Sequence, residues 1–172
     1  MIIKRALSRF FVILLLATLL TLSSCLGRHL EEKEAAFQQL FSQVVMNKHL
    51  ELNIIEPQSE DFPPGVVDLI LENKSDHFIH FTPGFNAKIF AYSIETHRWT
   101  EIGNKISYSG NDIILYPKGN NLHSVTIVGV LPDLSGPSSP KNLRIVVAGT
   151  IYRDNKATNE QVGAYTDVNW PP

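Results

Sequence analysis

From Leu50 onward the chain alternates apolar and polar residues with a period of two, and this pattern restricts the possible fold more than any other feature. Leu50, Leu52 and Ile54, for example, are separated by polar residues. A period of two places successive side chains on opposite faces of a β-strand. Interrupted by turn-forming residues, the pattern predicts strands at residues 50–54, 66–72, 77–82, 87–94, 99–102, 112–116, 123–131, 143–153 and 161–169.

Turn chemistry separates these strands, and no helical pattern lies between them. Glu95–Arg98 is expected to close a hairpin, and Pro132–Asn142 is the longest turn-rich loop. Strands without intervening helices are expected to pair antiparallel. Their uneven lengths favour a sandwich over a closed barrel, and the arrangement resembles an immunoglobulin-like domain without the Cys…Trp…Cys signature. We therefore expect an all-β fold, an antiparallel immunoglobulin-like β-sandwich of about eight strands spanning residues 50–172.

The apolar positions of these strands predict the core of the β-sandwich. Truncating a large buried side chain typically costs about 2–5 kcal/mol, so each core position is testable by substitution. The residues expected in the core are Leu69, Leu71, Phe78, Ile89, Trp99, Val125, Ile127, Ile145, Val147 and Tyr165.

A helical pattern precedes the strands. Apolar residues recur at i, i+3, i+4, i+7 and i+8, which gives one apolar stripe behind an acidic first turn. The stripe consists of Phe37, Leu40, Phe41, Val44 and Val45. The pattern predicts an amphipathic helix from about Leu30 to Met46, within a tether that covers residues 25–49.

The N-terminal residues have the organisation of a signal peptide. Lys4, Arg5 and Arg9 precede thirteen mainly apolar residues, Phe10–Leu22. That stretch is shorter than the roughly 20 residues of a membrane-spanning helix. An ordinary secretory signal with an incidental cysteine and a short signal anchor are the alternatives.

The segment Leu22-Ser23-Ser24-Cys25 resembles the lipobox of bacterial lipoproteins. The resemblance implies that residues 1–24 are removed and that membrane lipid is attached through acylated Cys25. More than one acyl chain is needed for stable anchoring, because one chain binds only marginally. Cys25 is the only cysteine, so no internal disulfide is expected.

Processing and composition bear on location and partners. Removal of the signal peptide leaves 12 basic and 17 acidic residues, a net charge of −5. There is no basic block for nucleic acid. In lipoproteins of bacteria with two membranes, aspartate after the cysteine marks inner-membrane retention, and Leu26 is not that mark. The resemblance therefore implies the outer membrane facing the periplasm, or the cell surface in a host with one membrane.

A second resemblance covers some thirty residues of the β-domain. Leu71–Asp76, His77–Phe81 and Arg98-Trp99 are similar to small β-domains of bacterial envelope lipoproteins. They are also similar to the intracellular proteinase-inhibitor domains of bacilli.

The search for catalytic chemistry starts from the histidines. His77 and His80 lie three apart on a predicted strand and so face opposite sides, which argues against a shared metal site. They could share a metal only if that strand were bulged, and a site formed by His80 with the distant His123 is the remaining alternative. No cofactor or metal is expected, and these three histidines are the first candidates if a metal is found.

Other residue pairs are interpreted as surface or core. Asp68 and Glu72 would lie about 13 Å apart along a strand, too far for a glycosidase pair. Tyr92 and Trp99 could stack on a sugar, although large aromatic residues in a sandwich more often anchor the core. No nucleophile motif or phosphate-binding loop is present.

These observations favour a non-enzymatic binding or structural module of the cell envelope, with another envelope protein as its possible partner. The alternative is a protease inhibitor that presents one of two proline-rich loops, Pro57–Gly65 or Pro132–Asn142. A metal-dependent enzyme is a distant third.

Overall fold

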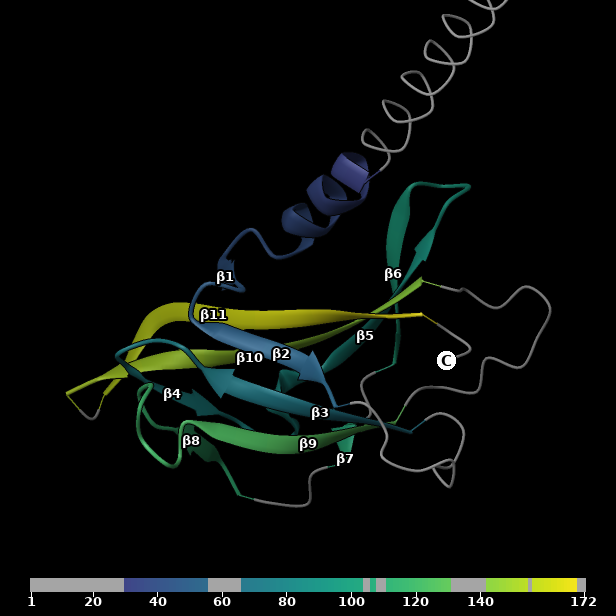
Figure 1. Cartoon of the computed structure of the whole chain (residues 1–172). Coiled ribbons are helices and arrows are strands. Elements are labelled where there is room, and N and C mark those ends of the chain that lie inside the picture. Colours follow the sequence, from purple (N-terminus) through teal and green to yellow (C-terminus); the bar gives the residue numbers. More distant parts are fainter. Residues whose placement is uncertain are drawn as a thin grey trace, which may run out of the picture. The chain divides into compact units, whose positions relative to one another are not determined.

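The computed structural model describes residues 30–55, 66–103, 106–107, 111–130, 142–154 and 156–169, with the backbone alone at residues 106–107 and 169. The chain divides into two compact units, Met1–Gln39 and Leu40–Pro172. In the described part, the first unit is helical and the second contains every strand (Figure 1). No helix within those residues is long and apolar enough to cross a membrane.

The helix is shorter than the sequence predicted. Residues 30–40 are helical, but Val44–Met46 forms strand β1 instead of a last helical turn. Val45 of β1 lies opposite Val162 in a parallel pairing. The expectation for Val44 and Val45 was wrong because β-branched residues also favour strands, and an open strand edge offers their backbone hydrogen-bond partners. The β-domain therefore begins before Leu50, within the segment assigned to the tether.

The second unit is all-β and contains two sheets, as the sequence predicted at the level of fold class. One sheet has seven strands, in the order β1-β11-β10-β4-β8, with β5 pairing beside β4 on β10 and β6 pairing with β5. Its strands are β1, β4 (Phe78–Phe81), β5 (Lys88–Ser93), β6 (Arg98–Gly103), β8 (Ile113–Leu115), β10 (Asn142–Arg153) and β11 (Lys156–Asn169).

The other sheet has four strands in the order β2-β3-β9-β7. These are β2 (Leu50–Ile54), β3 (Val66–Asn73), β9 (Ser124–Val130) and β7 (Ile106–Ser107). Among the described strand pairs, only β1 with β11 is parallel. A short 3₁₀ helix, η1 (Pro83–Asn86), leads from β4 to β5.

The longest feature of the fold is the hairpin of β10 and β11 (yellow-green and yellow in Figure 1). β11 begins at Lys156, five residues earlier than predicted, and Arg153 pairs with Lys156. Asp154, in the turn, has a φ of 51°, in the left-handed region that Asp tolerates better than most residues. The residues between Arg153 and Gln161 are mostly polar and therefore predicted a loop. From Lys156 onward they form part of a strand because β11 pairs with β10.

One hydrophobic core takes buried residues from both sheets. Seven of the ten predicted core residues are buried, six of them in this core, and Val125 is partly buried against it. The seven are Leu69, Leu71, Ile89, Trp99, Ile127, Ile145 and Val147. Trp99 is buried outside this core, with its ring centroid 4.7 Å from the guanidinium carbon of Arg144.

Two of the predicted core positions differ from the expectation. Phe78 is 41% exposed, because Ile79 and Phe81 occupy the core-facing positions of β4 and leave Phe78 on the other face. Its ring contacts that of Tyr116, with centroids 5.1 Å apart. Tyr165 is half-buried, since Ala164 takes the core-facing position beside it on β11.

Asn73 at the end of β3 links the two sheets through the hydrogen bonds of its buried side chain. Its Nδ2 donates to the carbonyl oxygens of His77, at 2.7 Å, and Tyr116, at 2.8 Å. Its Oδ1 accepts from the backbone N–H of Ser75, at 2.9 Å, and from the Ser75 hydroxyl, at 2.7 Å. Because His77 precedes β4 and Tyr116 follows β8, one amide side chain of the four-stranded sheet holds two strand ends of the seven-stranded sheet.

Candidate functional site

Several of the sequence-predicted functional residues lie outside the described part of the chain. These are the lipobox residues Leu22, Ser23, Ser24 and Cys25, and the loop Pro57–Gly65. Of the loop Pro132–Asn142, only Asn142 is described, as the first residue of β10.

Two of the three candidate histidines, His80 and His123, make separate local contacts. His80 Nε2 lies 2.9 Å from Asp112 Oδ2, and its ring stacks near that of Tyr152 at 5.0 Å. The ring of His123 contacts the carbonyl oxygen of Asn120. Among the described residues, no group of three or more His, Cys, Asp or Glu side chains is close enough to hold a metal ion.

The aromatic pair considered for sugar stacking is buried. Tyr92 and Trp99 are opposite each other on β5 and β6, with ring centroids 5.2 Å apart. They are 5% and 7% exposed. Their faces are therefore covered by protein, which corresponds to the core-anchor interpretation of these rings.

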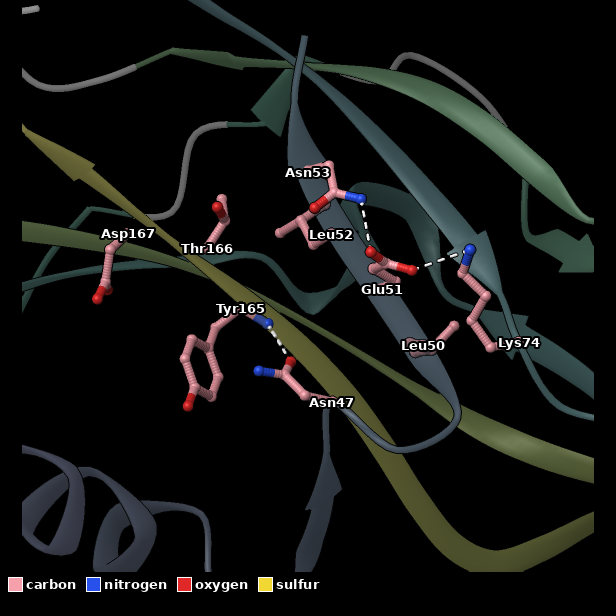
Figure 2. A pocket seen from close by; sticks show the side chains of 9 residues that line it. All are labelled: Asn47, Leu50, Glu51, Leu52, Asn53, Lys74, Tyr165, Thr166 and Asp167. Carbon is pink, nitrogen blue, oxygen red and sulfur yellow. Dashed lines mark hydrogen bonds and ion pairs between the residues drawn. The ribbon is translucent and has the colours of Figure 1, made fainter.

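The sequence did not predict the pocket that the structure forms between β2 and β11. It has a volume of about 410 Å³ and opens to solvent. Figure 2 shows β2 crossing over β11, with side chains of both strands around the space between them. The lining residues are Asn47, Leu50, Glu51, Leu52, Asn53, Lys74, Tyr165, Thr166 and Asp167.

Asn47 positions the two walls, because the chain passes from one sheet to the other at this residue. Its backbone N–H donates to the Gly163 carbonyl oxygen at 2.9 Å. Its Oδ1 accepts from the Tyr165 N–H, also at 2.9 Å, where the next residue of β1 would otherwise pair (Figure 2). With a φ of 53°, Asn47 ends β1 and directs the chain into β2. The Asn47 side chain thus accepts a backbone hydrogen bond from β11 at the point where the pairing of β1 with β11 ends.

The backbone of β2 is paired on one side only among the described strands. The Ile55 N–H donates to the Asp68 carbonyl, and the Lys74 N–H donates to the His49 carbonyl. With the register of β2 and β3, these bonds place the N–H and C=O groups of Glu51 and Asn53 toward β3. The same groups of Leu50, Leu52 and Ile54 therefore point away from β3, along the edge that borders the pocket.

Charged side chains on β2 and β3 form one exposed cluster beside this edge. Lys74 Nζ lies 2.9 Å from Glu51 Oε2 and also contacts Glu72. Hydrogen bonds from Asn53 and from Lys74 hold the pKa of the Glu51 carboxyl below its usual value. Hydrogen bonds to Glu72 and Glu51 raise the pKa of Lys74. With two carboxylates and one ammonium group, the cluster has a negative formal charge.

The β11 wall is braced by a buried arginine. Arg144 on β10 is 1% exposed, and its guanidinium forms two hydrogen bonds with Asp167, at 2.6 and 2.9 Å. The guanidinium carbon lies 3.9 Å from the ring centroid of Tyr165 and 4.7 Å from that of Trp99. A bidentate ion pair and two cation–π contacts hold the arginine in a single position. Two lining residues of the pocket, Tyr165 and Asp167, are therefore held rigidly.

Sequence reasoning missed Arg144 as well as the pocket. The arginine stands between Leu143 and Ile145 in a strongly β-branched, apolar run, and a charge at such a position is rarely buried without a partner. The sequence therefore indicated that Arg144 has a partner. Its partner on β11 could be identified only from the register that places Arg144 opposite Asp167.

The pocket is suited to recognition by shape, hydrogen bonds and charge. It combines two leucines with amide, hydroxyl and carboxylate groups, and its volume lies within the roughly 300–1,000 Å³ of ligand sites in proteins. Its charged residues already have protein partners, Glu51 in Lys74 and Asp167 in Arg144. These pairs keep the walls of the pocket in place before anything binds.

A scan of the chain against protein-family models finds no match, and no curated protein matches it either.

Proposed function

We propose that this protein is a membrane-anchored, extracytoplasmic lipoprotein whose β-domain is a non-enzymatic binding module of the cell envelope. The observation that carries the proposal is the segment Leu22-Ser23-Ser24-Cys25 directly after a short apolar stretch with a basic start. In this proposal residues 1–24 are the signal peptide and acylated Cys25 holds the mature chain on the membrane.

In this proposal the β-domain is an immunoglobulin-like sandwich. Support comes from two mainly antiparallel sheets that share one core. The parallel strand β1 is a departure from a purely antiparallel arrangement. Sandwiches of this kind present binding surfaces at their edges and loops.

The binding role is supported by the pocket between β2 and β11. It lies at an open edge of the four-stranded sheet, and its walls are held by ion pairs and by the Asn47 hydrogen bonds. A rigid, partly apolar recess with charged groups at its border is typical of a recognition site.

Metabolic labelling with a clickable palmitate analogue tests the anchor. The wild-type protein is expected to incorporate label and Cys25→Ala to incorporate none, while Ser24→Ala, which keeps a small residue in the lipobox, is the matched control and retains labelling. The mature mass should correspond to a chain that begins at acylated Cys25. Equal labelling of wild type and Cys25→Ala, or a different first residue, would contradict the proposal.

Location and activity class are measured separately. In a host with two membranes, density-gradient fractionation should place the protein with outer-membrane markers, and recovery with inner-membrane markers would contradict that placement. EDTA should leave the melting temperature unchanged, whereas stoichiometric metal in the purified protein would favour a metal-dependent enzyme. Inhibition of a protease by the intact chain would favour the inhibitor role.

A further inference from the structure

We infer that the edge of β2 that no described strand covers binds an extended peptide of another protein, with alternating apolar and basic residues, as a fifth strand of the four-stranded sheet. The inference rests on the proposal that the domain is a binding module, and it does not depend on the lipid anchor. It identifies the class of partner and the way in which the pocket is filled.

The backbone of β2 is the first part of the argument. The N–H and C=O groups of Leu50, Leu52 and Ile54 point away from β3, and none of them has a hydrogen-bond partner among the described residues. A row of such groups is a template for an added strand, because each main-chain donor and acceptor can pair with an incoming peptide.

β2 also differs from the other terminal strands of the two sheets. β1 and β8 have three residues each and β7 has two, lengths that limit pairing with another chain. β6 has six residues, but its pairing with β5 contains an irregularity between Ile89 and Phe90. β2 offers five residues in uninterrupted register with β3, without a proline or a bulge. Natural sheets usually protect such an edge, and this one is unprotected within the described residues.

The side chains define the preferred peptide. Leu50 and Leu52 face the core, and Ile54 shares their face of β2 but is 38% exposed. Peptide residues opposite these three positions would direct their side chains toward the pocket and cover Ile54. Apolar side chains suit these positions, since Leu50 and Leu52 line the space.

The intervening peptide positions would lie beside Glu51 and Asn53 on the outer face of the sheet. Glu51 has a half-exposed carboxylate within a cluster of two carboxylates and one ammonium group. A lysine or arginine directly across from Glu51 would neutralise the net negative charge of this cluster. Alternation along the strand therefore places apolar residues inward and basic residues outward.

A peptide-binding assay tests the inference on the full chain purified in mild detergent. The probe is a fluorescein-labelled peptide of nine residues that alternates lysine and valine. Its control carries N-methyl groups on the valines, which removes the N–H groups that would face β2 and keeps the side chains and charge. We expect the control to bind at least about tenfold more weakly than the probe, a loss of about 1.4 kcal/mol.

Two substitutions test the site on the protein. Ile54→Pro removes an outward N–H without removing a bond to β3 and should raise the Kd of the probe at least about tenfold, whereas Ile54→Val keeps the N–H and should bind like wild type. Glu51 lies on the exposed face of β2. Glu51→Lys should therefore weaken binding of the lysine–valine peptide and strengthen binding of a peptide with glutamate in place of lysine. Circular dichroism establishes that each variant is folded.

Hydrogen exchange locates the contact independently of affinity. The amides of Leu52 and Ile54 should exchange rapidly in the free protein and at least about tenfold more slowly with the probe, while that of Asn53, already bonded to β3, should change little. Equal binding of the N-methylated peptide, failure of the probe to bind, unchanged binding by Ile54→Pro or protection at another edge would each overturn the inference. If the chain self-associates and Ile54→Pro abolishes that self-association, the edge binds a second copy of this chain. That outcome would also overturn the inference of a peptide from another protein.

Failure of this inference is distinguishable from failure of the proposed function. Palmitate labelling reports on Cys25 alone and is independent of β2. If cross-linking in the envelope captures the same partner with wild type and with Ile54→Pro, the protein is still a binding module but uses a different surface.

Discussion

Replacing Asn73 by alanine is the sharpest test of how the two sheets are held together. Asn73 is fully buried, and its side chain makes four hydrogen bonds of 2.7–2.9 Å with Ser75, His77 and Tyr116. Alanine removes all four and leaves buried main-chain groups without their partner. We therefore expect a larger effect than the loss of any one exposed hydrogen bond.

The expected magnitude follows from these contacts. A buried hydrogen bond contributes about 1 kcal/mol net, so the loss of four should cost about 3–5 kcal/mol of unfolding free energy. That is a large part of the roughly 5–15 kcal/mol that stabilises a typical domain. For a domain of this size, it corresponds to a fall in melting temperature of roughly 10–15 °C.

Urea and thermal unfolding of the chain without its signal peptide measure the effect. Asn53→Ala is the matched control, because Asn53 is exposed and, among the described residues, its amide nitrogen donates only to the Glu51 carboxylate in the same strand, at 3.0 Å. The control should change stability by less than about 0.5 kcal/mol. If Asn73→Ala costs no more than Asn53→Ala, the proposed role of Asn73 as the link between the sheets is wrong.

Asn73→Asp adds a pH dependence to the same test. One carboxylate oxygen can still accept from Ser75, but the other faces the two carbonyl oxygens of His77 and Tyr116. This contact favours the protonated acid and raises the pKa of the introduced carboxyl in the folded state. Stability should then be greatest below the unfolded pKa of about 3.9 and fall as the pH rises through the folded pKa. A variant equally stable at acid and neutral pH, relative to wild type, would contradict the geometry.

Two further substitutions examine the β10 strand, each with a matched control and measured by urea unfolding. Arg144→Ala should lower the free energy of unfolding by about 2–4 kcal/mol, because it removes a buried bidentate ion pair and two cation–π contacts. The control Arg153→Ala removes an exposed pair with a carboxylate and should lower it by less than about 1 kcal/mol. Similar losses for the two variants would mean that the burial of Arg144 adds no stability. Gly149→Ala would place a Cβ 2.8 Å from the His80 carbonyl oxygen and should lower the free energy of unfolding by about 1–3 kcal/mol. In the control Gly129→Ala the nearest atoms to the new Cβ lie at 3.5 Å, so the loss of stability should be smaller. A larger loss for Gly129→Ala than for Gly149→Ala would refute the packing argument.

The local pattern of the sequence determined the fold class, the positions of most strands and most of the core. Alternation in segments such as Leu50–Leu52 and Val125–Ile127 identifies the positions that face the core, because the two faces of a strand meet different environments whatever strands lie beside it. The same reasoning failed at Phe78. That strand is apolar on both faces, so the pattern could not indicate which face meets the core.

The tertiary structure decided the features that depend on partners distant in the sequence. The role of Val44–Met46 was set by the open edge of β11, and the pairing of Arg144 with Asp167 was set by the register of β10 and β11. The candidate site is of the same kind. Leu50–Ile54 was recognisable as a strand from its alternation, but its position at an edge, beside a pocket walled by β11, exists only once both sheets have formed. Side-chain periodicity is encoded locally, whereas strand neighbours are chosen by packing across the whole domain.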